Sequence, residues 1–296
     1  MKILLIGCGL TGKAIVSNLL GFSFIDQIAL YSRTIKSSNA LKDQLNSTKI
    51  NVIENLDSII NFQYIIVTLS GMSDGVREES MFKCKTTYEV RQDELKYNLG
   101  ALAGLIKPLK KIRRDAKVIV VTNPVDEITN FLRIILKNEN VFGFGLDLDS
   151  KRYSNLLGRE ILCIGTHGKA VPLINSNLES DYDNLFKKVD SELMSYIRRN
   201  GIPHNAAGEA FAKFFSKFIS KKKQILHVSY YLKKYFQGVN NISISLPCEV
   251  NKGKILGIAD FKVNSIEKKR FQKLVKQLKQ SVNHILMTHK KLISYK

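Results

Sequence analysis

Three ionisable residues in the middle of the chain have the types and spacing that acid–base chemistry on a small organic acid requires. Asp149 and Arg152 stand three residues apart, so on a helix they share one face. His167 follows in a glycine-flanked turn after an apolar run that predicts a strand. Arginine binds a carboxylate through two parallel hydrogen bonds, and histidine exchanges a proton with a hydroxyl or keto oxygen while an aspartate fixes its tautomer. Hydride transfer to or from a 2-hydroxy acid needs this set of side chains.

The beginning of the chain predicts a phosphate-binding turn. An apolar run at residues 3–6 predicts a strand, and residues 7–12 then read Gly-Cys-Gly-Leu-Thr-Gly before a helix expected over residues 13–20. Glycines at this G-x-G-x-x-G spacing permit a tight turn, and the pyrophosphate of a dinucleotide approaches the backbone at the positive end of the helix. The residues expected to contact the cofactor here are Gly7, Gly9, Leu10, Thr11 and Gly12.

The end of the next predicted strand, residues 28–31, bears on the choice of cofactor. About 20 residues after the glycines, NAD-binding domains carry an acidic residue that binds the ribose hydroxyls. This chain has Tyr31, Ser32 and Arg33 there instead. Ser32 with Arg33 would receive a 2′-phosphate, whereas Arg33 as a plain surface residue leaves NAD as the cofactor. We therefore expect NAD or NADP, bound in part by these three residues.

Alternating elements predict an α/β fold whose N-terminal part is a Rossmann-type, doubly wound parallel sheet. Further strands are expected at residues 50–53, 64–68 and 117–122, with helices between them. After about residue 145 the pattern changes to two amphipathic helices, a group of strands and a long last helix. Those strands are expected at residues 225–230, 242–246, 249–251 and 255–258. We predict a dinucleotide-binding domain at residues 1–144 and an α+β substrate domain at residues 145–296.

Two more motifs complete a series that runs along nearly the whole chain. The strand at residues 117–122 leads into Asn-Pro-Val-Asp at residues 123–126, and residues 91–98 read Arg-Gln-Asp-Glu-Leu-Lys-Tyr-Asn. With Leu-Asp-Ser-Lys-Arg at residues 148–152 and Gly-Thr-His-Gly at residues 165–168, this order resembles the lactate/malate dehydrogenase family. The family's motifs are R-x-D-L-x-x-x-N, T/S-N-P-V-D, L-D-x-x-R and G-x-H-G. In this chain Leu95 arrives one residue late.

The resemblance implies a role for each matching residue. His167 would be the acid–base residue, paired with Asp149, and Arg152 would bind the substrate carboxylate. Arg91 would polarise the substrate carbonyl as a mobile loop closes and excludes water. Asn123 would hydrogen-bond the substrate and position the nicotinamide. The remaining histidines are interpreted as ordinary core or surface residues: His204, His227, His284 and His289.

The segment before Arg91 departs from the family. Residues 69–90 form a loop about twice as long as the dozen or so residues that are typical. In the family the residue six positions before this arginine selects the substrate, arginine for oxaloacetate and an uncharged residue for pyruvate; counting back gives Lys85. A longer loop would admit a bulkier 2-oxo acid, as in hydroxyisocaproate dehydrogenases, or is a surface elaboration. We expect a lactate/pyruvate-like substrate, with malate or a bulkier acid as alternatives.

The composition narrows the choice of partners. The chain has 46 Lys and Arg against 26 Asp and Glu, a net charge of +20, which attracts acidic metabolites and dinucleotides. No nucleic-acid recognition motif accompanies the charge, so no specific nucleic acid is expected. No apolar run reaches the about 18 residues of a membrane span. Four scattered cysteines indicate reduced thiols in a cytoplasmic protein with no metal site. The family implies a homodimer or homotetramer.

Other departures support a second hypothesis, a dinucleotide-binding sensor or interaction protein with little catalytic activity. They are the turn at residues 31–33, Thr166 and Lys169 beside His167, and Pro203 where the family has a threonine or serine near the substrate. Such a protein would bind a dinucleotide without turning over any 2-oxo acid. The two hypotheses therefore differ in turnover and agree in binding.

Overall fold

The first half of the protein is a parallel sheet, in a computed structural model that describes residues 1–289. Its strand order is β3-β2-β1-β4-β5-β6, and every neighbouring pair is parallel. Most of the strand residues are buried, as in a sheet with helices on both faces. The strands are β1 (Lys2–Ile6), β2 (Gln27–Tyr31), β3 (Ile50–Val52), β4 (Tyr64–Val67), β5 (Lys117–Val120) and β6 (Val141–Phe144). The predicted doubly wound α/β fold is confirmed.

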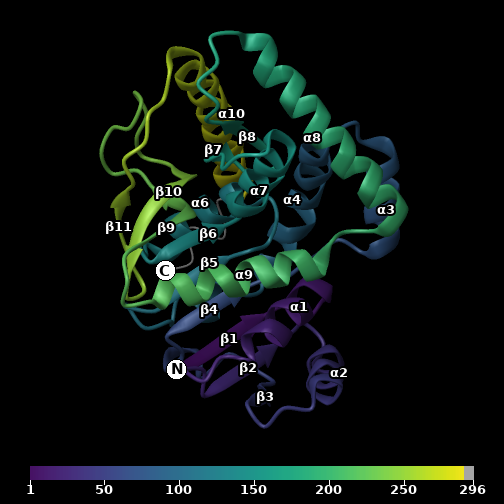
Figure 1. Ribbon diagram of the computed structural model, residues 1–296. Helices are drawn as coiled ribbons and strands as arrows, with labels where there is room; N and C mark the ends of the chain where they lie inside the picture. The colour runs from purple at the N-terminus through teal and green to yellow at the C-terminus, as the bar shows by residue number, and fades with distance from the viewer. Residues whose placement is uncertain (290–296) are drawn as a thin grey trace.

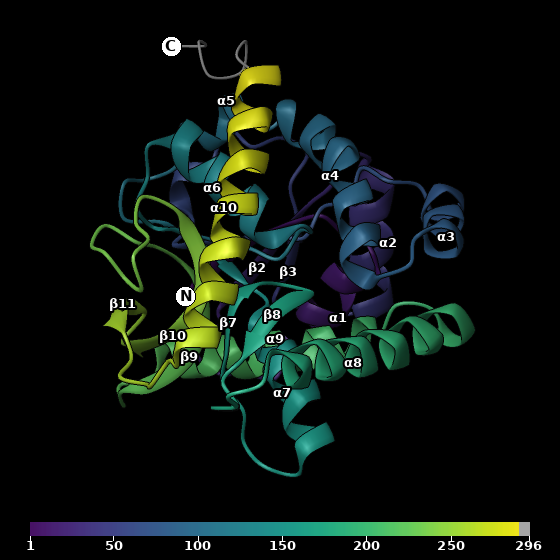
Figure 2. The same ribbon diagram turned by 90° about the horizontal axis from the view of Figure 1, so that it is seen from above.

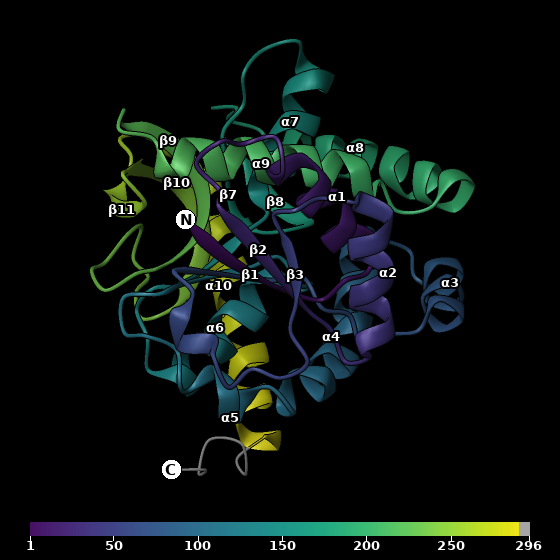
Figure 3. The same ribbon diagram turned by 90° about the horizontal axis from the view of Figure 1, so that it is seen from below.

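Helices follow most of these strands and cover the two faces of the sheet (Figure 3). They are α1 (Leu10–Leu19), α2 (Ile35–Leu45), the short 3₁₀ helix η1 (Ile59–Asn61), α3 (Asp74–Lys83), α4 (Thr87–Ala103), α5 (Ile106–Leu109) and α6 (Val125–Leu136). The strand order reverses between β1 and β4. Ligands of such sheets bind at the carboxyl ends of the strands at this switch point, which is where the glycine turn lies.

The second half extends the same sheet with antiparallel strands. β9 pairs with β6, β10 with β9, β7 with β10 and β8 with β7, while β11 pairs with β10 at the side. The elements are α7 (Leu146–Leu157), β7 (Cys163–Thr166), β8 (Lys169–Pro172), α8 (Glu179–Asn200), α9 (His204–Ile219), β9 (Gln224–Tyr231), β10 (Ser243–Asn251), β11 (Lys254–Ile258) and α10 (Ser265–Thr288). One sheet thus runs through both halves, and a domain boundary at residues 144 and 145 stays a prediction.

The segment at residues 69–90, expected as a loop, is partly helical. It contains α3, which lies at the outer edge of the molecule beside α4 (Figure 2). Helix α4 also begins earlier than expected, at Thr87, because a capping box starts it: Thr86 Oγ1 accepts from the Glu89 nitrogen, and the Glu89 carboxylate accepts from the Thr86 nitrogen. Arg91 is therefore in the second turn of α4.

The predicted strands at residues 242–246 and 249–251 are one strand, β10. Pairing with β9 continues across Pro247, which lies opposite His227. The Pro247 carbonyl accepts from the Ala259 nitrogen on the side away from β9, so the missing N–H of Pro247 also faces away from β9. The ladder between the two strands loses no hydrogen bond, and for this reason the proline does not end the strand.

Helix α9 brings the second half of the chain against the glycine turn. It lies along α1 (Figure 1), and Gly208 makes the approach possible, since a Cβ there would lie 2.6 Å from the Ala14 backbone. Four phenylalanines of α9 are buried in the same core: Phe211, Phe214, Phe215 and Phe218. The N-termini of α1 and α9 consequently lie close together.

Across residues 1–289 the structure has no helix with both the length and the apolar character needed to span a membrane.

Candidate active site

The glycine turn between β1 and α1 forms one wall of a cavity of about 1710 Å³. Gly7 has a φ of +111°, and a Cβ on it would lie 2.5 Å from the Leu69 nitrogen. A Cβ on Gly12 would lie 2.1 Å from the Gly7 carbonyl oxygen. Gly9 instead borders open space, so a ligand can reach the backbone there. The N-cap residue of α1 is Gly9, which has no side chain to cap the helix, so the positive end of α1 is available to an anion.

The end of β2 lines the same cavity with Tyr31, Ser32 and Arg33. Ser32 Oγ donates to the Thr34 carbonyl at 2.7 Å and lies 2.7 Å from Ser38 Oγ. Arg33 is exposed, and residues 31–38 include no carboxylate. This end of the cavity therefore offers hydroxyls and a cation to a ligand.

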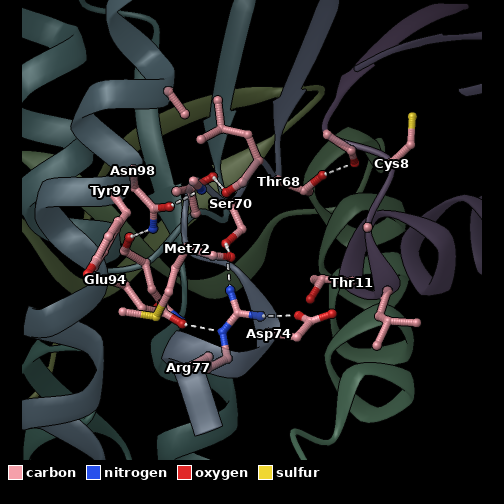
Figure 4. Close-up of a pocket in the computed structure, with 18 of the residues that line it drawn as sticks. Cys8, Thr11, Thr68, Ser70, Met72, Asp74, Arg77, Glu94, Tyr97 and Asn98 are labelled. Atoms are coloured by element: carbon pink, nitrogen blue, oxygen red, sulfur yellow. Dashed lines mark hydrogen bonds and ion pairs between the residues drawn. The ribbon is translucent and has the colours of Figure 1, made fainter. Parts of the chain in front are cut away.

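Helix α3 closes another side of the cavity with Arg77. Its guanidinium donates to Glu94 at 3.0 Å, to Asp74 at 3.2 Å and to Ser70 at 2.5 Å (Figure 4). These contacts join α3 to α4 and to the loop after β4. Arg77 is thus engaged with protein acceptors at this wall.

The aspartate, arginine and histidine singled out from the sequence meet at the start of α7 and the end of β7. His167 Nδ1 lies 2.5 Å from Asp149 Oδ2, and Arg152 Nη1 lies 3.3 Å from Asp149 Oδ1. Burial alone would raise the pKa of Asp149, but the nearby His167, Arg152 and Arg91 outweigh it and lower that pKa to about 2. Burial lowers the pKa of His167, an effect that Asp149 opposes and Arg91 reinforces.

Asp126, at the start of α6, binds the backbone of His167. Its carboxylate accepts from the His167 backbone nitrogen at 3.0 Å, from Ser229 Oγ at 2.7 Å and from Ser245 Oγ at 2.9 Å. Burial raises the pKa of Asp126 to about 6, although these three donors oppose the shift. The turn that carries His167 is therefore attached to β9 and β10 through one carboxylate.

Arg91 reaches this cluster from α4. It is buried, and its guanidinium packs against the turn after His167, since a Cβ on Gly168 would lie 2.3 Å from Arg91 Nη1. Burial lowers the pKa of Arg91, and the nearby Asp149 partly opposes this shift. Nη1 is buried and has no hydrogen-bond partner within residues 1–289. A buried donor without a partner is costly, and a ligand oxygen would satisfy it.

Asn123 lies just after the end of β5 and belongs to the cavity lining, which does not include Arg91, Asp149, Arg152 or His167. Its backbone carbonyl accepts from Asn98 Nδ2 at 2.6 Å, and Asn98 Oδ1 accepts from the Gly71 nitrogen at 2.7 Å. Asn98 therefore joins the strand end to the loop before α3. Asn123 itself lines the cavity, and its Oδ1 is buried without a partner in the described part of the chain.

Two residues lie elsewhere than the sequence indicates. Lys85 is exposed between α3 and α4, and it does not line the cavity. Its role as a substrate-binding residue stays a prediction. His204, interpreted as an ordinary histidine, lines the cavity and lies 2.7 Å from Thr11 Oγ1 through Nδ1. Sequence reasoning missed it because 193 residues separate the two partners.

Within residues 1–289, no group of three or more His, Cys, Asp or Glu side chains is arranged to hold a metal ion.

Comparison with known proteins gives matches over nearly the whole chain. Residues 159–288 match the lactate/malate dehydrogenase, alpha/beta C-terminal domain. The chain is 24% identical to an L-lactate dehydrogenase of Pseudothermotoga lettingae, with 95% of this chain and 96% of that protein covered. It is 26% identical to a malate dehydrogenase of Methanosphaera stadtmanae, with the same two shares covered.

Solved structures show the same fold. The malate dehydrogenase from Aeropyrum pernix superposes with a TM-score of 0.74 at 21% identity, covering 95% of this chain and 97% of that one. The malate dehydrogenase from Plasmodium falciparum has a TM-score of 0.78 at 17% identity, covering 99% and 100%. The order of motifs, the match of residues 159–288 to the C-terminal domain and the relatives that align over 95% of this chain all show similarity to lactate and malate dehydrogenases.

Proposed function

We propose that this protein is a nicotinamide-dependent oxidoreductase that interconverts an L-2-hydroxy acid and its 2-oxo acid. The observation that carries the proposal is the convergence of His167, Arg152 and Arg91 on Asp149, together with a cavity that the glycine turn and Asn123 line. Relatives named L-lactate dehydrogenase and malate dehydrogenase support the same reaction class.

The residues present fit a dinucleotide. Gly9 leaves the backbone open beside the uncapped end of α1, and the cavity is large enough for two nucleosides and a diphosphate. Gly7–Gly12 would hold the diphosphate, the residues after β2 the adenosine ribose, and Asn123 Oδ1 the carboxamide of the nicotinamide. When bound, the nicotinamide supplies the two-electron partner for the alcohol and ketone.

The chain's own residues carry the proton and the charge. With Nδ1 bonded to Asp149, His167 presents Nε2 to the substrate oxygen and either donates a proton to it or accepts one. Asp149 fixes the tautomer and stabilises the imidazolium. Arg152 keeps one contact with Asp149 and has further N–H groups to bind the substrate carboxylate in a two-pronged pair. Arg91 Nη1 would donate to the oxygen on which charge develops.

A monocarboxylic substrate of the lactate/pyruvate type is the proposed first choice, with malate/oxaloacetate and a branched 2-oxo acid as alternatives. A second substrate carboxylate would need a free cation in the α3 segment. Arg77, the cation that α3 contributes to the cavity wall, is already bonded to Glu94 and Asp74. The resemblance to lactate and malate dehydrogenases also leads us to propose a homodimer or homotetramer.

The test is oxidation of NADH and NADPH, followed separately at 340 nm, against pyruvate, oxaloacetate and 2-oxoisocaproate. Fast turnover in one combination supports the proposal and identifies both cofactor and substrate class. Absence of turnover in all six, by a folded protein that binds a dinucleotide, contradicts the proposal and favours a binding protein.

A further inference from the structure

His204 occupies an unusual place at the cavity wall. It is the first residue of α9, and the packing of α9 on α1 brings it to the glycine turn. Nδ1 lies 2.7 Å from the hydroxyl of Thr11, the second residue of α1. The imidazole therefore bridges the N-terminal ends of two helices at the point where the turn would hold a diphosphate.

The other ring nitrogen of His204 is uncommitted. Nε2 has no hydrogen bond within residues 1–289, and the side chain borders the cavity. The charged groups that face the ring are Arg77 and Asp74, both from α3 (Figure 4 shows them on the wall near Thr11). Thr11, from α1, adds no charge. Burial lowers the pKa of His204, Arg77 lowers it further and Asp74 partly opposes them. These effects favour the uncharged ring in the protein without a ligand.

We propose that His204 is a ligand of the dinucleotide's diphosphate and that it takes up a proton when the dinucleotide binds. This inference rests on the proposed function only in requiring that the cavity binds a dinucleotide. It does not depend on which 2-oxo acid is the substrate.

The hydrogen bond to Thr11 connects the proton to the anion. In the neutral tautomer with the hydrogen on Nε2, Nδ1 accepts from the Thr11 hydroxyl, and this bond uses the only hydrogen of that hydroxyl. After proton uptake Nδ1 donates instead, so the Thr11 hydroxyl hydrogen turns to a phosphate oxygen. Nε2 carries a hydrogen both before and after proton uptake. One proton thus adds a positive charge and frees one further donor, the Thr11 hydroxyl, for the diphosphate.

Proton uptake by His204 makes the affinity for the dinucleotide depend on pH. A bound dianion raises the His204 pKa, so the protein binds the dinucleotide more tightly at low pH, and this gain is lost as the pH rises through the pKa of the complex. We expect the affinity for NADH or ADP-ribose to fall by about tenfold between pH 6 and pH 8.

Isothermal titration calorimetry of the full chain with NADH, and separately with ADP-ribose, tests this directly. Titrations at pH 7 in two buffers of different ionisation enthalpy give the number of protons taken up. We compare wild type with His204→Asn, which can still hydrogen-bond Thr11 but cannot be protonated. His284→Asn, at an exposed site on α10, is the matched control.

Wild type and His284→Asn should take up a proton and lose affinity with rising pH, whereas His204→Asn should do neither. Binding without proton uptake in wild type overturns the inference and leaves the proposed function intact, as does His204→Asn with unchanged uptake and pH dependence. Failure of wild type to bind either ligand overturns both. Absence of proton uptake by wild type overturns the inference even where the His204 variant does not fold.

Discussion

Helix α7 carries two aspartates two positions apart, and each binds a histidine from another element. Asp149 Oδ2 lies 2.5 Å from His167 Nδ1, and Asp147 Oδ1 lies 3.0 Å from His227 Nδ1. Both histidines are largely shielded from solvent, with 10% of the His167 side chain and 5% of the His227 side chain exposed. An aspartate partner and burial therefore do not distinguish the two.

The second ring nitrogen distinguishes them. His227 Nε2 accepts from the Cys163 nitrogen at 3.4 Å and lies 3.0 Å from Ser150 Oγ. His167 Nε2 has no hydrogen-bond partner within residues 1–289, and Arg91 and Arg152 lie nearby. Both nitrogens of His227 serve the fold, whereas His167 retains one for a substrate. A catalytic histidine is therefore indicated by a free ring nitrogen and nearby cations, because an aspartate–histidine pair also occurs where both nitrogens only stabilise the fold.

The largest expected effect is that of removing the free nitrogen. For His167→Gln we expect kcat to fall by about 10²–10⁴-fold, because the proton donor and acceptor is lost. Steady-state assays at 340 nm measure the fall, and calorimetry with NADH should give unchanged dinucleotide affinity. A variant with nearly normal kcat would contradict the role given to His167.

Removing the guanidinium of Arg152 should also lower activity strongly. Arg152→Ala should lower kcat/KM by about 10²-fold or more, since a two-pronged charged contact to the substrate carboxylate is lost. Arg152→Lys, which keeps the charge without the planar fork, should fall between the two. Equal activity of the alanine variant and wild type would show that the carboxylate binds elsewhere.

Replacing His227 should lower the stability of the protein rather than its turnover. His227→Ala removes one hydrogen-bond partner from each of Asp147, Ser150 and the Cys163 nitrogen, so the free energy of unfolding should fall by about 1–3 kcal/mol. Urea unfolding measures this loss, and kcat per folded molecule should remain near that of wild type. Unchanged stability with lost turnover would reverse the assignment of the two histidines.

The pH profile should give the smallest effect. Burial, opposed by Asp149 and assisted by Arg91, lowers the His167 pKa in the free protein. Oxidation of the hydroxy acid needs the neutral ring, so its kcat/KM should fall only at pH below the ordinary range of a histidine. Reduction needs the protonated ring, and its kcat/KM should decline as the pH rises through the same pKa. If kcat/KM for oxidation began to fall at alkaline pH as the pH was lowered, the lowered His167 pKa would be contradicted.

The sequence predicted what lies in contiguous motifs. Asp149 and Arg152 share a helix face by spacing alone, and the glycine turn followed a strand and preceded a helix as expected. The capping box of Thr86 and Glu89 is also a local sequence pattern, and it predicts the start of α4 correctly. Local patterns of this kind suffice because their partners are within a few residues.

Contacts across the fold could not be read in this way. Thr11 meets His204 only because Gly208 lets α9 approach α1, and a glycine in a helix does not indicate its neighbour. The continuation of β10 through Pro247 depends on which side of the strand that residue faces. The roles of His167 and His227 were separated by motif resemblance, and the hydrogen bonds of their second nitrogens give the physical reason.

The most direct test of this account compares Asp149→Asn with Asp147→Asn, two identical substitutions on one helix. We expect Asp149→Asn to lose about 10²–10⁴-fold in kcat, because the histidine tautomer and the imidazolium lose their support. Asp147→Asn should keep kcat near that of wild type, since its amide oxygen still accepts from His227. Similar losses in both variants, or a larger loss in Asp147→Asn, would contradict the claim that only the Asp149–His167 pair carries the chemistry.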